Sequence, residues 1–468
     1  MHKVSVPGSM RDPSTVRKPG GTAGSRPRFR FNRESLRASL WFWPVLACLG
    51  ALLLTLLLLP VRPDGGPGSA DWLWPSGVDA AATLLQTVAT SVMTAATVTF
   101  SLTVVALQLA SQQFSPRLLR EFARDPLTQV VLAVLLATFV VSITGLRGMD
   151  PERPVPVLVV ALVYALGIGC AAVLLLFIGH ITRSLRVDTM MLTVHQTCLA
   201  VLDDTYPASE KGEVQTFPAA AGGTLVPAVR SGIVQAVHWQ PLMRILEEQR
   251  LVLRMQVQPG DHVTVGTPVA TVWHDDGGGA VDLAGLRQCL VDALEIGYER
   301  TPEQDAALGL RQLTDIAVKA TSWSINDPIT AAHALGYCAD LLVDIQRRRL
   351  GPEGHADSAG TVRLVTVGRD YRYFLDLVCG PVRRFANSEP IVLTAILRLL
   401  RDCAANAVNQ DQRNEIRRQA ELVLETMADG LIGADELEIR DMARRVHAAA
   451  DGKIEEAFAD RAGETRSV

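Results

Sequence analysis

One apolar stretch of the chain carries a row of polar side chains at helical spacing. Between Thr83 and Gln112 the sequence has no charged residue and is mostly apolar. At about 100° per residue the polar positions fall within an arc of roughly 80°, interrupted only around Val104 and Val105. The row consists of Gln112 and seven candidate site residues, Thr83, Thr87, Thr90, Thr94, Thr97, Ser101 and Gln108. Because hydroxyls and amides in lipid must meet another helix, water or an ion, the row predicts a packed seam or a wet path.

A basic segment follows this row. Pro116 is expected to end or kink the helix, and three arginines come directly after it, Arg117, Arg120 and Arg124. Arginines at the inner mouth of a path would bias which ions approach it. The alternative is that they only obey the positive-inside rule, under which basic residues collect in cytoplasmic loops.

A second polar motif lies much later in the chain, in the segments 300–305, 309–317 and 324–331. Its candidate site residues are Arg311, Asp315, Asn326, Asp327 and His333. Locally, Asp327 suits a helix N-cap with Pro328 at the first helical position, and Asn326 suits the turn before it. The motif therefore allows two interpretations, a helix start that specifies the fold or a polar site.

Four apolar segments must position these residues. The chain is 48% hydrophobic, and the excess is concentrated before about residue 183. Each segment is long enough to cross a hydrocarbon core of about 30 Å. They run from about Leu40 to Val61, Val78 to Ala110, Leu127 to Leu146 and Val155 to Ile181. The sequence thus predicts four transmembrane helices, none with a charge buried at its centre.

Basic residues predict the orientation of these helices. They are dense before Leu40 and again between residues 117 and 124, but sparse in the first and third connections. By the positive-inside rule both termini are cytoplasmic. A cleaved signal peptide is the competing interpretation of the first segment, which is longer than a typical signal core of about 7 to 15 residues.

After the fourth segment the pattern changes from membrane helices to a cytoplasmic α+β region. A helix is expected from about Asp188 to Leu202, followed by short alternating runs from Glu213 to Trp273 that predict a small β-module. Residues 257–272 resemble half of the barrel-sandwich hybrid of biotinyl and lipoyl carriers, with Gly260, Asp261 and Gly266 at turns. Residues 213–273 contain no lysine, so a carrier function is rejected and no cofactor is predicted.

From about Leu283 onwards, helices are predicted together with a single strand at 361–367. The helices are expected at about 283–295, 302–320, 328–349, 371–384, 390–407, 410–428 and 434–458. The predicted organisation is a disordered basic leader (1–36), a transmembrane domain (37–186), a linker helix with the β-module (187–280), a helical bundle (281–460) and a disordered tail (461–468).

Several function classes are disfavoured by what the sequence lacks. The seven cysteines are scattered without a CxxC pair, and the histidines have no metal-binding helical spacing, so no metal site is predicted. We find no P-loop, dinucleotide fingerprint or GxSxG elbow, which predicts that the protein is not an enzyme. A formal charge of −4 implies no nucleic-acid partner. Because no acid or base lies at midplane, a coupled transporter is disfavoured.

Two segments resemble a known family. The run from Thr94 to Arg120 and the motif from Ile325 to Ala331 are similar to the predicted bacterial membrane proteins catalogued as domain of unknown function 2254. The resemblance extends over about residues 36 to 430. It implies an inner-membrane protein with a large cytoplasmic part and offers no catalytic residues to transfer. Residues 321–324 depart from the Leu-Ser-Pro-like run expected before the Asn-Asp-Pro step.

Two functions remain open at this point. The first is a homo-oligomeric channel or pore lined by the second transmembrane helix, with a cytoplasmic regulatory domain. The second is a non-conducting scaffold or sensor, in which the polar row packs against the other spans and the cytoplasmic part binds a protein or small ligand. The lipid bilayer is a partner in both.

Overall fold

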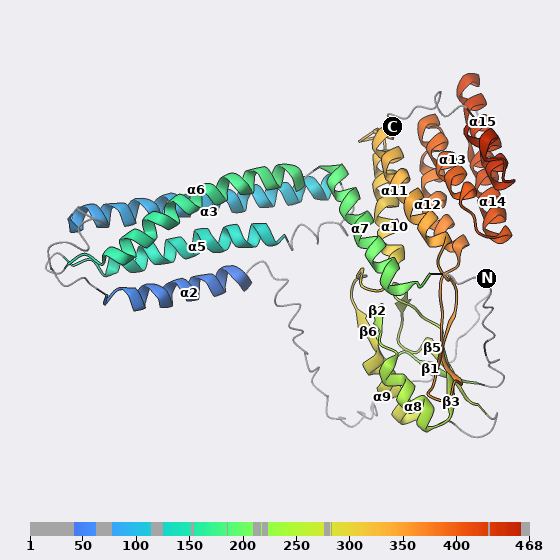
Figure 1. Cartoon of the computed structure of the whole chain (residues 1–468), viewed down its shortest axis with the longest axis horizontal. Coiled ribbons are helices and arrows are strands. Elements are labelled where there is room, and N and C mark those ends of the chain that lie inside the picture. Colours follow the sequence, from blue (N-terminus) through green and yellow to red (C-terminus); the bar gives the residue numbers. More distant parts are fainter. Residues whose placement is uncertain are drawn as a thin grey trace, which may run out of the picture.

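The computed structural model describes residues 42–61, 77–113, 125–150, 154–184, 186–208, 217, 223–275, 281, 283–428 and 431–459. The expected leader (1–36) and tail (461–468) lie outside these residues. Figure 1 shows a group of apolar helices lying side by side, with the rest of the chain beyond one end of that group. We call residues 187–459 the extramembrane part.

Four apolar helices form where the sequence predicts them. They are α2 (Phe42–Leu58), α3 (Val78–Gln113), α5 (Pro126–Arg147) and α6 (Val157–Ser184). By length and composition, α3, α5 and α6 are able to cross a membrane, whereas α2 is a shorter apolar helix of 17 residues. The chain is therefore a mostly helical protein with three candidate membrane spans and a region that contains sheets.

Helix α5 lies at the centre of this group and contacts α2, α3 and α6. Its start is fixed by Asp125, whose carboxylate accepts hydrogen bonds from the backbone N–H groups of Leu127 and Thr128. His180, near the end of α6, lies 3.1 Å from the same carboxylate and joins the two helices at this end. Gly145 lets the helices approach closely, because a Cβ there would lie 2.7 Å from Val159 and 2.8 Å from Leu85.

Helix α7 (Val187–Thr205) leads from α6 to the extramembrane part, close to the helix expected at 188–202. Its buried residues, which include Met191, Val194 and Leu202, belong to the core of the helical bundle. Cys198 lies so close to α10 that a Cβ at Gly309 would come within 2.6 Å of it. The connection from the membrane helices is thus packed into the bundle along the length of α7.

Two sheets form the β-module, and their strands come from both sides of residue 280. The five-stranded sheet has the order β1 (Thr224–Pro227), β5 (Pro268–His274), β3 (Leu251–Met255), β8 (Val362–Thr366) and β7 (Glu353–Ala356). The three-stranded sheet has the order β4 (His262–Val263), β2 (Gly232–Val237) and β6 (Leu294–Gly297). Helices α8 (Gln240–Glu248) and α9 (Leu283–Ala293) pack on their shared apolar core.

The sequence prediction missed part of this module. Strand β8 lies at the expected place, but β6, β7 and α8 were not predicted. Strand β6 follows α9 without a turn residue, and β7 contains glycine and histidine, so neither carries a strand pattern of its own. Their conformation depends on pairing with β2 and β8.

The remaining helices form one bundle around a single apolar core. They are α10 (Ala306–Ala320), α11 (Pro328–Gln346), α12 (Tyr371–Phe385), α13 (Pro390–Ala405), α14 (Gln410–Thr426), α15 (Gly433–Ala450) and α16 (Ile454–Phe458). The last predicted helix, 434–458, is in fact two. Gly452, with a φ of 82°, ends the first of them in a conformation that other residues rarely adopt.

The close approach at Gly145 provides a test of the membrane-helix packing. We expect Gly145→Ala to lower the thermal midpoint of the full chain in detergent, because the added methyl group overlaps Val159 and Leu85. Gly169→Ala in α6 is the matched control, since nothing lies within 4 Å of a Cβ there. Equal midpoints for the two variants would contradict this packing.

Candidate functional site

The polar row of α3 lies on the outside of the membrane-helix group. Helix α3 buries the small and apolar residues Ala81, Leu85, Val92, Ala96 and Ala106 against α5 and α6. At about 100° per residue, these positions lie roughly opposite the polar row. All seven predicted site residues of the row are exposed, namely Thr83, Thr87, Thr90, Thr94, Thr97, Ser101 and Gln108. Within one chain, therefore, the row does not pack against the other described helices.

Each threonine hydroxyl of the row is satisfied by its own helix. Thr83, Thr87, Thr90, Thr94 and Thr97 donate to the carbonyl four residues earlier, at 2.7 to 3.0 Å. The hydroxyl oxygens keep lone pairs that are free to accept from water or to face a cation. Val104 and Val105, which interrupt the row, are also exposed. The row is therefore a face of acceptors with an apolar interruption.

The predicted inner mouth lies outside the described residues. Arg117, Arg120 and Arg124 fall in the gap between residues 113 and 125. The nearest described polar group on the chain is Asp125, which caps α5 and pairs with His180 as described above.

The Asn-Asp-Pro step begins helix α11, as the capping pattern predicts. The Asp327 carboxylate accepts hydrogen bonds from the Thr330 N–H at 3.0 Å and the Thr330 hydroxyl at 2.6 Å. The hydroxyl bond is the largest of the effects that lower the pKa of Asp327 below its ordinary value. Asn326, with a φ of 50°, makes the left-handed turn that precedes the cap. This geometry accounts for both residues by local structure.

The other three candidates of this motif differ in their surroundings. Arg311 and Asp315 lie one turn apart on α10 and are half-buried. His333 is exposed on α11 and is near enough to Asp327 to favour its charged form electrostatically. A site role for the five candidates of this motif stays a prediction; they are Arg311, Asp315, Asn326, Asp327 and His333.

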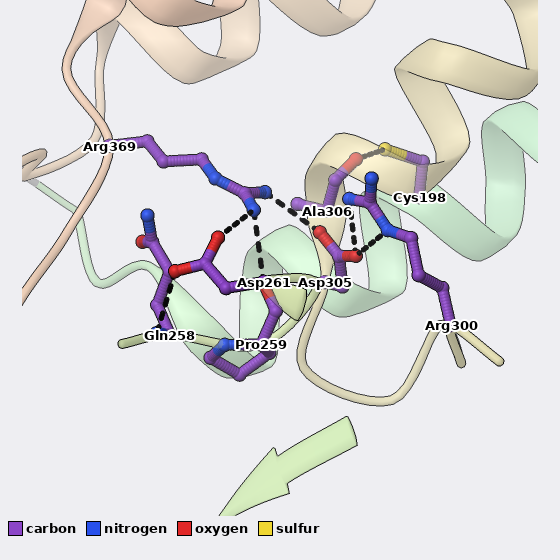
Figure 2. A network of polar contacts seen from close by, with 8 residues as sticks. All are labelled: Cys198, Gln258, Pro259, Asp261, Arg300, Asp305, Ala306 and Arg369. Atoms are coloured by element: carbon purple, nitrogen blue, oxygen red, sulfur yellow. Dashed lines mark hydrogen bonds and ion pairs between the residues drawn. The ribbon is translucent and has the colours of Figure 1, made fainter. Parts of the chain in front are cut away.

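A buried ion cluster around Asp305 is the main polar feature that the sequence analysis did not select as a site. Asp305, just before α10, has a side chain that is 1% exposed. Its two oxygens accept from Arg300 Nε at 2.7 Å and from Arg369 Nη1 at 2.8 Å (Figure 2). Burial alone would lower the pKa of Arg369, but Asp305 and other neighbours raise it, so this guanidinium stays charged.

The cluster connects the β-module to the bundle. Arg369 Nη2 donates to the Pro259 carbonyl at 3.0 Å and lies 3.7 Å from Asp261, in the turn between β3 and β4. Figure 2 shows this turn facing Arg369 and Asp305, with Cys198 of α7 beside Ala306. The Cys198 thiol donates to the Ala306 carbonyl at 3.3 Å. Three parts of the chain therefore meet at the start of α10.

Sequence signals for this cluster existed but were ambiguous. Arg300 and Asp305 belong to the polar motif that begins at residues 300–305, and Gly260 and Asp261 belong to a turn expected within residues 257–272. Arg369 lies between a strand and a helix, with no local pattern that identifies its partner. Only the folded chain brings these groups together.

The cysteines of the bundle are unsuited to nucleophilic chemistry. Cys198, Cys338, Cys379 and Cys403 are buried, and burial raises the thiol pKa of each, to about 12 for Cys198 and Cys403. These thiols are therefore protonated near neutral pH. Within the described ranges, no group of three or more His, Cys, Asp or Glu side chains could hold a metal ion.

Comparison with known proteins gives a family and two uncharacterized relatives. The family model described as "Predicted membrane protein (DUF2254)" matches residues 37–402. Uncharacterized proteins Rv1290c of Mycobacterium tuberculosis and Mb1321c of Mycobacterium bovis are each 33% identical to this chain over 348 residues. The match covers 73% of this chain and 67% of each relative. No solved structure matches the chain.

Two glycines with similar backbone angles test the importance of the ion cluster. Gly260 has a φ of 92°, and a Cβ there would crowd Asp305 and Arg300, whereas Gly266 has a φ of 87° and open space. We expect Gly266→Ala to cost about 1 kcal/mol of folding free energy, from the backbone alone. Gly260→Ala should cost about 3 kcal/mol more, because it disturbs a buried ion pair. Thermal unfolding of the full chain in detergent would rank the two, and equal losses would contradict the role given to the cluster.

The cap of α11 makes a second prediction at this site. Asp327→Ala should lower the free energy of unfolding by about 1 kcal/mol, because the Thr330 N–H loses its acceptor. Asp327→Asn should retain most of the stability, since asparagine is an equally good N-cap. The measurement is the unfolding midpoint of both variants. A large loss for asparagine would show that the negative charge, rather than the cap, is what Asp327 supplies.

Proposed function

Because the chain belongs to the DUF2254 family of predicted membrane proteins, we propose that it is a homo-oligomeric channel or pore. Helix α3 lines the path, and the extramembrane part is a cytoplasmic regulatory domain. The protein acts in this proposal without a cofactor or catalytic centre. Its partners are the lipid bilayer and other copies of the same chain, with no nucleic acid; a cytoplasmic protein partner is a further candidate.

The exposure of the polar row supports this proposal. A helix that faced lipid around its exposed side would be expected to carry apolar residues there, as α2 does with its many exposed leucines. On α3 the exposed side carries the polar row as a stripe flanked by exposed apolar residues such as Met93, Val98 and Phe100. No described residue of the same chain covers the row, and the α3 helices of other copies would cover it around a shared axis.

The chemistry of the row fits a hydrated path. Its hydroxyl oxygens and the Gln108 amide would replace part of the water around a passing ion, and Val104 with Val105 would form an apolar constriction. Helix α3 has 36 residues, or about 54 Å, which exceeds a core of about 30 Å. Its end therefore projects from the membrane towards Arg117, Arg120 and Arg124, the proposed inner mouth.

The proposed topology has four spans in a bacterial inner membrane, with both termini in the cytoplasm. Helix α2 is the first span in this proposal, with a length of about 25 Å against a core of about 30 Å. The basic leader before it and the basic segment at 117–124 lie on the same side by the positive-inside rule. The β-module is proposed as a barrel-sandwich relative that carries no prosthetic group.

A second candidate is a non-conducting scaffold or sensor, and one observation favours it. Every threonine hydroxyl of the row that is described above already donates to its own helix. Such hydroxyls are tolerated in a dry seam between helices. In this alternative, α3 helices of neighbouring copies pack tightly, and the extramembrane part binds a protein or small ligand.

Ion flux into liposomes tests the channel directly. Purified full-length protein should conduct, and Thr94→Leu or Ser101→Leu should reduce flux about tenfold or more, because an isobutyl group narrows and dries the path. Met93→Leu is the matched control, since Met93 is exposed on the same helix but lies away from the row. Both polar positions are exposed, so neither substitution disturbs packing within the chain.

Each outcome of this experiment decides between the two functions. Flux that falls with Thr94→Leu and Ser101→Leu but not with Met93→Leu supports a path along the row. Absence of flux, or flux that is indifferent to all three substitutions, would reject the channel and leave the scaffold.

A further inference from the structure

One end of the helical bundle gathers large apolar side chains that no described residue covers. Trp323 is fully exposed in the connection between α10 and α11, and Ile325 follows it. Phe385 is 67% exposed at the end of α12, close in sequence to exposed Ile391. Ile432 and Leu437, at the start of α15, are 73% and 70% exposed. We call these six residues the apolar tip.

The three connections that form the tip lie together. Helices α10 and α12 pack against each other, both have 15 residues, and both begin at the Asp305–Arg369 ion pair. They therefore end at the same level, about 22 Å away from that pair. The Ala428 N–H donates to the Asn387 carbonyl at 2.9 Å, which joins the α14–α15 connection to the α12–α13 connection. The tip is thus one surface, at the end of the bundle away from the β-module.

The β-module carries an apolar groove at the opposite end of the extramembrane part. Val226 and Val229 line it on one side, and Leu290 and Val291 of α9 on the other. Val229 is 61% exposed. The charged residues that line it are Arg230 and Arg287. In Figure 1, α9 lies at the far end of the extramembrane part from the tops of α13 and α15.

The charges around the two surfaces are complementary. Glu389, Asp435 and Glu438 lie beside the tip residues, and none of these carboxylates pairs with a basic group among the described residues. Arg384 offsets them in part. The groove presents the guanidinium groups of Arg230 and Arg287, which likewise have no acidic partner in the described part of the chain. Asp292 and Glu295, next to lining residues, offset them in part, and Glu295 lies 3.6 Å from His238. An apolar, acidic tip and an apolar, basic groove favour contact with each other.

We propose that the tip of one copy binds the β-module groove of the next copy. Because the two surfaces differ and lie at opposite ends of the same part, the contact is head-to-tail, and we propose that its rotation closes, so that repeating it forms a ring rather than an open filament. Figure 1 shows the bundle helices running across the direction of the membrane helices, so such a ring lies parallel to the membrane. The inference rests on the proposed oligomer and gives it a specific interface. In such a ring the membrane helices of all copies extend from the same face, and their α3 helices lie either around that face or near the ring axis.

A second copy fits the tip better than the membrane surface does. The cytoplasmic leaflet of a bacterial membrane is anionic, and the unpaired carboxylates beside the tip would be repelled by it. The tip also points along the membrane plane, away from the ends of α3, α5 and α6 (Figure 1). Within one chain the tip and the groove are at opposite ends, so they do not cover each other.

Cysteine cross-linking in native membranes tests the contact. The background is the full chain with Cys48→Ala and Cys289→Ser, because the five other cysteines are buried. The test variant adds Ile432→Cys in the tip and Val229→Cys in the groove. Copper-phenanthroline oxidation should give a ladder of covalent oligomers that stops at the ring size. Either single cysteine should give no more dimer than the background does.

The outcomes are distinguishable. A dimer from Ile432→Cys alone would mean that two tips meet symmetrically, and no ladder from the pair would mean that lipid or another protein occupies the tip. Either result overturns the head-to-tail contact.

Thr94→Cys in the same background tests the shared α3 path separately. A cross-link there without the ladder would keep the proposed oligomer and reject only this interface, whereas a ladder without flux would keep the interface and reject the channel.

Charge placed in the tip offers a second test that does not depend on cysteine geometry. Ile432→Glu with Leu437→Glu should reduce the oligomer fraction in detergent at least tenfold, because two carboxylates would be buried in the contact. Val408→Glu is the matched control, since Val408 is 53% exposed at the other end of the bundle. Equal assembly of the tip and control variants would contradict the proposal. The tip positions are exposed, so folding of the single chain is preserved.

Discussion

The ion cluster at Asp305 determines how the extramembrane part is assembled. A carboxylate that is almost completely buried needs full compensation, and here two guanidinium groups and their neighbours provide it. Those groups come from distant places, Arg300 after β6 and Arg369 before α12. The turn at Pro259 adds a carbonyl, and the first residue of α10 receives the Cys198 thiol of α7. The helix that comes from the membrane, the β-module and the bundle therefore all meet at this cluster, in addition to their other contacts.

This fixed point has a consequence for the surfaces of the protein. Helices α10 and α12 both start there and run in the same direction, so their far ends come together as the apolar tip. The β-module is held at the near end, so its groove lies at the opposite end of the extramembrane part from the tip. A single chain thus carries two complementary surfaces that it is unable to join by itself. The proposed ring follows from this geometry together with the charges on each surface.

The membrane helices show a similar one-sidedness. Helix α3 uses alanine, leucine and valine to pack on α5 and α6, and the threonines of the polar row point away from them, whereas Thr99 on the packed side is buried. The two functions considered from the sequence place these threonines in different surroundings. The channel places them along a path between copies, and the scaffold packs them against the other spans. The exposure of the row removes packing against the other described spans within one chain. In the proposals made above, both the channel and the scaffold place neighbouring copies at α3.

The prediction of the fold from sequence succeeded where local signals were strong. Asp327 with Pro328 gave the start of α11, and proline at 390 gave the start of α13, because capping and proline geometry depend on a few adjacent residues. It failed at β6 and β7, which are strands only because β2 and β8 lie beside them. The break at Gly452 was missed because the apolar pattern continues through it into Phe458. The five polar residues selected around Asn326 were chosen by proximity in sequence, whereas the buried cluster joins residues that are more than a hundred positions apart.

The sequence by itself determined the membrane helices, the order of the later helices and the polar row of α3. Hydrophobic length and helical period are properties of consecutive residues, so no partner is needed to recognise them. The tertiary structure alone decided which side of α3 is covered, which charges are buried together, and where the exposed apolar residues gather. These depend on contacts between residues far apart in the chain, and the pairing of Asp305 with Arg369 is the clearest case.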